Sequence, residues 1–147
     1  MRLHVGLVPV AIAFALLHVS ARADDLPTLQ MSEGIQLLTG GETVVHDYFL
    51  KTGAWPPNIN QLYTAASRWP AGTYVQFIGS SPSADGKSYG MVATMKNKGN
   101  GIDPRVAGKA VEIWSSDGGA SWHCGPASIN PVDPQYLPAS CRESGAP

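Results

Sequence analysis

The sequence has few charged residues and only two cysteines, and these shortages exclude several classes of protein. Charged side chains make up 14% of the chain, with 10 basic and 11 acidic residues and a net charge of −1. A chain without a basic excess has no general attraction for nucleic acid or for anionic lipid. Its two cysteines lack the C-x-x-C spacing of structural zinc sites. Nucleic acid and metal are therefore disfavoured as ligands, and no cofactor is expected.

Catalytic motifs are also missing. Beyond the apolar N-terminal segment the only histidines are His46 and His123, which are far apart in the sequence. The chain has no Gly-x-Ser-x-Gly nucleophile elbow. A Ser/His/Asp site stays formally open, but scattered residues of these types occur in any chain. We therefore expect a protein that is not an enzyme.

Long apolar runs are confined to the N-terminus. Arg2 is followed by the mostly apolar stretch Val5–Val19 and then by Ala21-Arg-Ala23. A basic start, a short apolar run and small residues at −3 and −1 predict a secretory signal peptide over residues 1–23, cleaved after Ala23. The alternative is an uncleaved membrane anchor, although the run contains Pro9 and is shorter than the roughly 20 residues of a spanning helix. The remainder, residues 24–147, is the size of one domain.

The two cysteines, Cys124 and Cys141, lie near the C-terminus of the region predicted to be exported. Cysteines in an oxidising compartment form disulfides, and two cysteines allow a single intramolecular pairing. The segment between them is rich in proline. The sequence therefore predicts a Cys124–Cys141 disulfide, which should contribute about 3 kcal/mol by closing this loop.

One long helix is predicted over Gln30–Lys51, followed by a stop at Gly53. Three glycines, Gly34, Gly40 and Gly41, lie inside it and each costs about 1 kcal/mol relative to alanine. Such a helix should need a sheet to pack on, and its glycines would allow a close approach. Its apolar residues recur with the period of a helix: Met31, Ile35, Leu38, Val45 and Phe49.

The rest of the domain has the residue pattern of β-strands separated by turns. Ser80–Gly86 and Asp117-Gly118 are predicted turns, and Lys96–Gly108 is a long loop. One helix followed by these strands predicts an α+β fold, in which an N-terminal helix packs on a four-stranded antiparallel sheet and a disulfide-bounded loop closes the C-terminus. The predicted strands are Thr73–Ile78, Ser88–Met95, Lys109–Ser115 and Ala120–Cys124.

The predicted helix and its exit contain three notable segments, Gln30–Gly34, Thr43–Phe49 and Gly53–Pro56. The C-terminal part contains Ser121–Cys124, a Pro-rich loop and Tyr136–Arg142. In this order the segments resemble the globular domain of type IV pilins of the type IVa class. The first three are similar to the second half of the pilin helix and its exit, and the C-terminal ones resemble the family's disulfide-bounded region. The resemblance spans Leu29 to Arg142. It implies a non-enzymatic, pilus-associated protein of the bacterial cell envelope, exported to the periplasm or the cell exterior, with a role in adhesion or assembly.

The N-terminus departs from the family's pattern. Pilins open with a short basic leader and a glycine, followed by an apolar Phe-Thr-Leu-Ile-Glu stretch that anchors the subunit and packs in the filament. Here no glutamate precedes Glu33, and a Sec-type signal peptide stands in that place. We therefore expect a soluble, mainly monomeric periplasmic protein that does not polymerise by itself.

The resemblance also indicates where partners would bind. In pilin-like proteins the variable surface consists of the connection after the helix and the disulfide loop, here Asn58–Ala71 and Gly125–Ser140. The expected partners are pilus subunits, pilus assembly proteins or a host or surface receptor. A free periplasmic regulator that binds pilin subunits is an alternative, whereas a DNA-uptake receptor is disfavoured because Gly125–Ser140 contains no Lys or Arg. Trp114 and Trp122 are expected to pack. The candidate binding residues are Trp55, Trp69, Asn130, Asp133, Gln135 and Tyr136.

Overall fold

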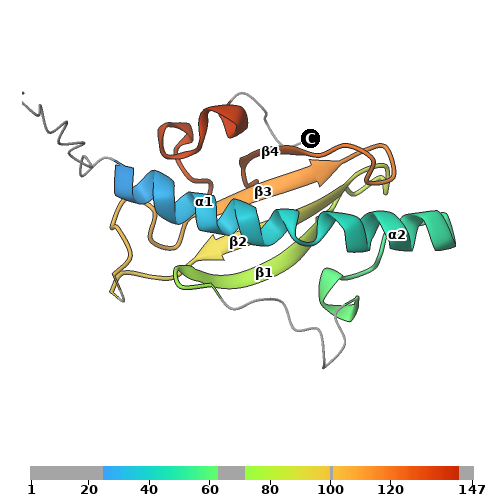
Figure 1. Cartoon of the computed structure of the whole chain (residues 1–147), viewed down its shortest axis with the longest axis horizontal. Helices are drawn as coiled ribbons and strands as arrows, with labels where there is room; N and C mark the ends of the chain where they lie inside the picture. Colours follow the sequence, from blue (N-terminus) through green and yellow to red (C-terminus); the bar gives the residue numbers. More distant parts are fainter. Residues whose placement is uncertain (1–24, 63–71, 100, 143–147) are drawn as a thin grey trace, which may run out of the picture.

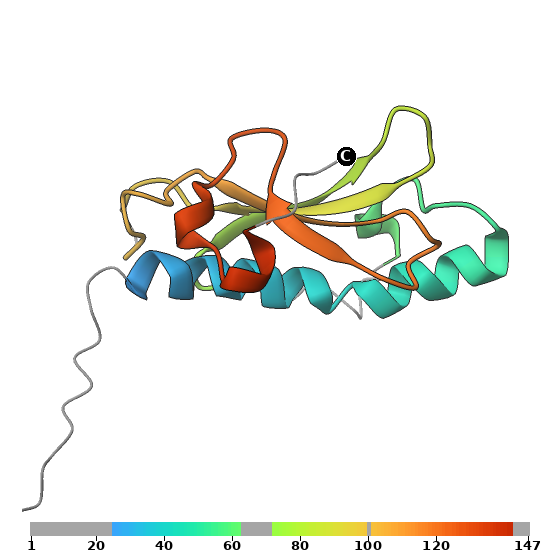
Figure 2. The same ribbon diagram turned by 90° about the horizontal axis from the view of Figure 1, so that it is seen from above.

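The structure is a computed structural model that describes residues 25–62, 72–99 and 101–142 (Figure 1). The predicted signal peptide and Trp69 lie outside the described residues. Two helices lie on one side of a four-stranded sheet and follow each other nearly in line, the first across the strands and the second toward and beyond the end of the sheet (Figures 1 and 2). The α+β fold predicted from the sequence is confirmed. No helix in the described part of the chain combines the length and apolarity needed to cross a bilayer.

The predicted single helix is in fact two helices, α1 (Asp25–Thr39) and α2 (Glu42–Thr52). The interruption lies at Gly40 and Gly41, where the Gly41 N–H turns back to donate to the Leu38 carbonyl at 2.9 Å. Two successive glycines lose enough backbone entropy in a helix to allow this break. The predicted stop is confirmed, because Gly53 takes φ of 71° and its N–H donates to the Phe49 carbonyl.

The sheet is an antiparallel meander in the order β1-β2-β3-β4. The first and last strands differ most from the predicted ranges, and the predicted helix also starts earlier than expected, at Asp25 and not at Gln30. Ser81 and Pro82 pair with Gly90 and Tyr89, so the first strand continues through a segment predicted as a turn. The last strand starts at His123 because Asp117 accepts hydrogen bonds from Ser115 and Ser121, which keeps the preceding residues in the turn. The strands are β1 (Val75–Pro82), β2 (Tyr89–Met95), β3 (Ala110–Ser115) and β4 (His123–Pro126).

The hydrophobic core lies between the two helices and the sheet. Gly34 of α1 brings the helix onto the strands, since a Cβ at this position would lie 3.3 Å from the Ala93 Cβ and from a Val111 methyl group. The prediction that a glycine permits close approach is confirmed here. Burial of each large apolar side chain contributes about 1.5–3 kcal/mol. Residues with no exposed surface in this core include Met31, Leu38, Val45, Tyr89, Met91 and Met95.

Polar side chains fix α1 at both sides of its contact with the strands. The buried amide of Gln30 donates to the Gly101 carbonyl at 2.8 Å and accepts from the Asp103 N–H at 2.9 Å. The Glu33 carboxylate accepts from the backbone N–H groups of Thr73 and Tyr74, just before β1. The helix is therefore held in register with the sheet by hydrogen bonds as well as by packing.

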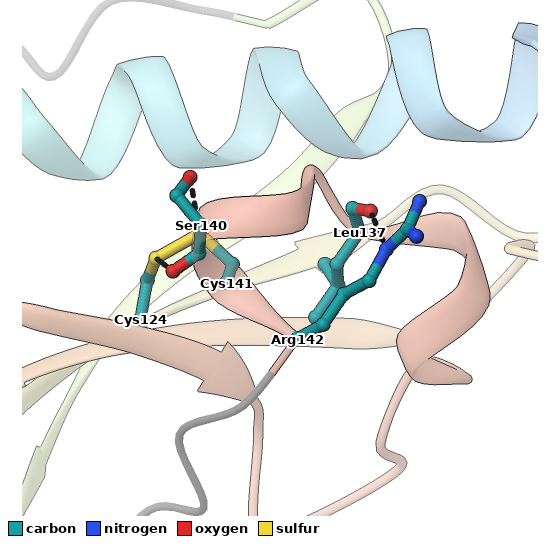
Figure 3. The surroundings of a disulfide bond; sticks show 5 residues. All are labelled: Cys124, Leu137, Ser140, Cys141 and Arg142. Atoms are coloured by element: carbon teal, nitrogen blue, oxygen red, sulfur yellow. Dashed lines mark hydrogen bonds between the residues drawn. A yellow bond between two sulfur atoms is a disulfide. The ribbon is translucent and has the colours of Figure 1, made fainter.

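The C-terminal segment folds back over the helix side of the sheet and is closed by the Cys124–Cys141 disulfide, as predicted (Figure 3). The two Cα atoms are 4.8 Å apart, and the bridge joins β4 to the short 3₁₀ helix η3 (Ala139–Cys141). Another 3₁₀ helix, η2 (Pro134–Tyr136), packs against α1. Arg142 donates from Nε to the Leu137 carbonyl at 2.8 Å (Figure 3), which holds the segment in a compact form.

Candidate binding surface at the disulfide-bounded region

The loop that follows β4 is attached to the start of β3. The Ala110 N–H donates to the Asn130 carbonyl at 2.9 Å, and the Ala110 carbonyl accepts from the Val132 N–H at 3.1 Å. Asn130 has a φ of 51°, a conformation that asparagine tolerates better than most residues. These bonds fix the backbone of the loop, while the Asn130 side chain remains exposed.

Asp133 and Gln135 form a local pair at the start of η2. The Asp133 carboxylate accepts from the Gln135 backbone N–H at 3.1 Å and from its side-chain amide at 3.0 Å. Both residues are exposed. The pair therefore presents a hydrogen-bonding surface whose backbone geometry is already set by the helical turn.

Tyr136 is half-buried and lies beneath a cation from another segment. The Arg105 guanidinium is 5.4 Å from the centre of the Tyr136 ring. Two hydrogen bonds, each of 2.9 Å, join Arg105 to the carboxylate of Asp103. These bonds hold the pKa of Asp103 below its ordinary value. The cation–π contact thus connects the loop between β2 and β3 to the disulfide-bounded region.

A shallow hollow forms where these segments meet. Arg105 and Lys109 border it from the β2–β3 side, and Asp133 and Tyr136 border it from the disulfide-bounded region. Gly125–Ser140 itself has no Lys or Arg, but the fold brings two basic residues beside it. Neither residue was predicted to belong to this surface, because the charges were counted within Gly125–Ser140 alone. We call Asn130, Asp133, Gln135, Tyr136, Arg105 and Lys109 the disulfide-region surface.

The structure does not bring Trp55 to this surface. Trp55 belongs to the segment that follows α2, and α2 lies at the end of the molecule away from the C-terminal segment that contains η2 (Figure 1). Its ring stacks on Tyr89 with centroids 5.6 Å apart and contacts Phe49 at 4.7 Å. Because this half-buried ring packs against the core, its main contacts are structural. It also lines a second hollow together with Pro57 and Lys87.

Two other tryptophans and two histidines make contacts within the domain. Trp114 is 8% exposed and stacks with the ring of His123, its partner across the strands. Trp122 precedes β4 and donates from its indole to the Gly119 carbonyl at 3.0 Å. His46 is within hydrogen-bond distance of the Gly118 carbonyl, at 2.9 Å. In residues 25–62, 72–99 and 101–142, no group of three or more His, Cys, Asp or Glu residues could hold a metal ion.

Comparison with known proteins agrees with this architecture. The pilin family, whose members form bacterial filaments, matches residues 30–142, from the buried Gln30 to the residue after the disulfide. The chain belongs to the pilin family. The segments that resembled pilins in the sequence analysis therefore identify the family correctly, and this pilin has a structural role and not an enzymatic one.

Three relatives illustrate the similarity of this pilin to fimbrial proteins. A fimbrial protein of Neisseria meningitidis serogroup A is 27% identical over 97% of this chain and 89% of its own length. The fimbrial protein EcpC of Eikenella corrodens is 33% identical over 90% of this chain and 82% of its own. The type IV major pilin protein PilE of Neisseria gonorrhoeae is 27% identical over 95% and 88%, respectively.

Proposed function

We propose that this pilin acts at type IV pili, in adhesion or assembly, and that it contacts its partners through the disulfide-region surface. The observation that carries the proposal is the contact between the loop that connects β2 to β3 and the disulfide-bounded region. Arg105 lies over Tyr136 while Asp133 and Gln135 stay exposed beside it. A rigid scaffold that holds exposed polar loops in one geometry is suited to recognition.

We further propose that residues 1–23 are a signal peptide and that the exported form begins at Asp24. The basic start, the short apolar run and the Ala-Arg-Ala site support cleavage after Ala23. N-terminal sequencing of the exported protein should give Asp-Asp-Leu-Pro. An N-terminus that retains Val5–Val19 would contradict cleavage and restore the membrane-anchor alternative.

Fractionation tests the association with pili. In a bacterium that assembles type IV pili, the tagged protein is followed by immunoblotting in sheared pili, membrane and periplasm. We expect wild-type protein in the pilus fraction and most of it lost from that fraction in Gln135→Arg. The control is Gln76→Arg, the same change at an exposed position of β1 outside the disulfide-region surface.

The outcome also separates this function from its alternative. Equal pilus association of Gln135→Arg and Gln76→Arg would refute a role for the disulfide-region surface. Recovery of wild-type protein in the periplasm only, in a complex with pilin subunits, would instead favour a free regulatory protein.

A further inference from the structure

The face of the sheet opposite the helices carries a hollow of about 270 Å³, distinct from the hollow at Tyr136. The loop after β4 rises on this side of the sheet (Figure 2). Side chains from β1, β2, β3 and this loop line the hollow. We call it the outer-face hollow; its lining includes Phe77, Ser81, Val92, Thr94, Glu112 and Ile129.

A buried carboxylate lies in the outer-face hollow. Glu112 is 3% exposed and belongs to β3, where it pairs with Val92 on one side and Gly125 on the other. Its neighbour Gly90 makes room for the acid, since a Cβ there would lie 2.2 Å from Glu112 Oε1. The strand next to Glu112 is therefore shaped around the carboxylate group.

One oxygen of this carboxylate lacks a partner. Burial raises the pKa of Glu112, and the nearby Ser81 hydroxyl and Ser128 backbone oppose part of that rise. Oε2, which is also buried, has no hydrogen-bond partner among the described residues. An acceptor in this position is costly to leave unpaired, and nearly all such groups in folded proteins have a partner.

Apolar side chains stand around the carboxylate. Ile129 is 78% exposed and Phe77 is 57% exposed, although both are large and apolar. The Phe77 ring lies over Gly79, where a Cβ would be 2.6 Å from the ring. None of the residues that line the hollow is basic. The hollow thus combines one acceptor without a partner and an apolar rim.

We propose that the outer-face hollow binds a primary ammonium group carried on a short apolar stem, with the ammonium at Glu112 Oε2 and the stem between Phe77 and Ile129. A single available oxygen suits an ammonium, which is a compact donor, better than a guanidinium, which prefers both carboxylate oxygens. An anion would be repelled. A free amine and the side chain of a lysine on another protein both present this chemistry.

A titration of the purified exported protein tests the site. Backbone N–H signals are followed by NMR while n-butylammonium chloride is added, with n-butanol and sodium butyrate as neutral and anionic controls. We expect saturable shifts at Val92, Glu112 and Ile129 with butylammonium alone. Affinity should fall as the pH is lowered and Glu112 takes up a proton, because no other lining residue of the hollow titrates.

Three variants measure separately how the charge of Glu112 and the apolar rim contribute to binding. Glu112→Gln should weaken butylammonium binding by at least about tenfold, as expected for loss of a charge-assisted hydrogen bond. Ile129→Ala, an exposed change that leaves the carboxylate in place, should weaken it severalfold. Leu50→Ala, on α2 away from the hollow, is the matched control and should have no effect.

The result also identifies the source of the amine. If Nα-acetyl-lysine methylamide binds as well as butylammonium, the site accepts a lysine of a partner protein; if butylammonium alone binds, it takes a small amine. Equal binding of butanol, or unchanged binding in Glu112→Gln, would overturn the proposal. If Glu112→Gln does not fold, unchanged affinity in Ile129→Ala or at lower pH would overturn it instead.

Discussion

The buried carboxylate of Glu112 should make the stability of the domain depend on pH. Burial raises the pKa of Glu112, so the folded chain holds this proton more tightly than the unfolded chain. The resulting stabilisation is complete below the ordinary pKa of glutamate and is lost as the pH rises through the raised value. Relative to Glu112→Gln, wild-type protein should gain free energy of unfolding between pH 7 and pH 4. Urea unfolding at several pH values measures this difference, and parallel curves would contradict it.

Gln30 should contribute far more to the free energy of unfolding than an exposed glutamine of the same helix. Its side chain forms the two hydrogen bonds between α1 and the loop before β3, and it has no exposed surface. Gln30→Ala removes both hydrogen bonds, to the Gly101 carbonyl and from the Asp103 N–H, and empties a buried position, so it should cost about 1–3 kcal/mol. Gln36→Ala, at an exposed position, should change the free energy of unfolding by less than about 0.5 kcal/mol. Equal losses in urea unfolding would refute this account.

Single residues also show where sequence analysis reaches its limit. Glu112 interrupts an otherwise apolar strand, and this was the signal that could have indicated a buried acid. Its alternation with Val111 and Ile113 predicted a face of the sheet but not what covers that face. Arg105 gave no signal at all, because its contact with Tyr136 depends on how two distant loops meet.

Among the secondary-structure elements, the two helices should need their contacts with the sheet in order to stay folded. A peptide of residues 25–52 contains Gly34 and the break at Gly40 and Gly41, and an isolated helix pays for its nucleation without tertiary contacts. We expect circular dichroism of this peptide in water to show a mostly unfolded chain. Strong helicity of the isolated peptide would contradict this prediction.

The disulfide should stabilise the last strand. It joins β4, an edge strand of four residues, to η3, with a separation of 17 residues along the chain. Cys141→Ser should lower the free energy of unfolding by about 2–5 kcal/mol. Reduction of the wild-type protein should cause a similar loss, and Ser140→Ala provides a control beside the bridge. A stability unaffected by reduction would contradict a structural role.

Element types and their order could be predicted from periodicity, because apolar residues recur differently in helices and strands. Element ends could not. Whether Gly40 and Gly41 continue a helix depends on how α2 packs, and whether Ser81 and Pro82 extend a strand depends on their partners Gly90 and Tyr89. These choices are made by tertiary contacts that local sequence does not contain.

For the whole molecule, we predict that purified residues 24–147 are monomeric. The apolar stripe of the helices, represented by Met31, Leu38 and Val45, has no exposed surface because the protein's own sheet covers it. Among the residues that the structure describes, the large apolar side chains that remain exposed are distributed over α1, α2, β1 and the loop after β4. Light scattering should give the mass of one chain at micromolar concentrations. Fibres or large oligomers formed by this protein alone would contradict the prediction.

The edge of the sheet at β1, which pairs with no further strand among the described residues, bears on the aggregation of such a protein. β1 stands first in the strand order, and edge strands can recruit strands of other molecules into continuous sheets. Its register shifts between Val75 and Phe77, and its last residue is Pro82, which has no N–H to donate. An incoming strand would meet an irregular ladder at both ends of β1. The edge is thus a poor template for amyloid-like growth, so contacts between copies of this domain should not extend its sheet.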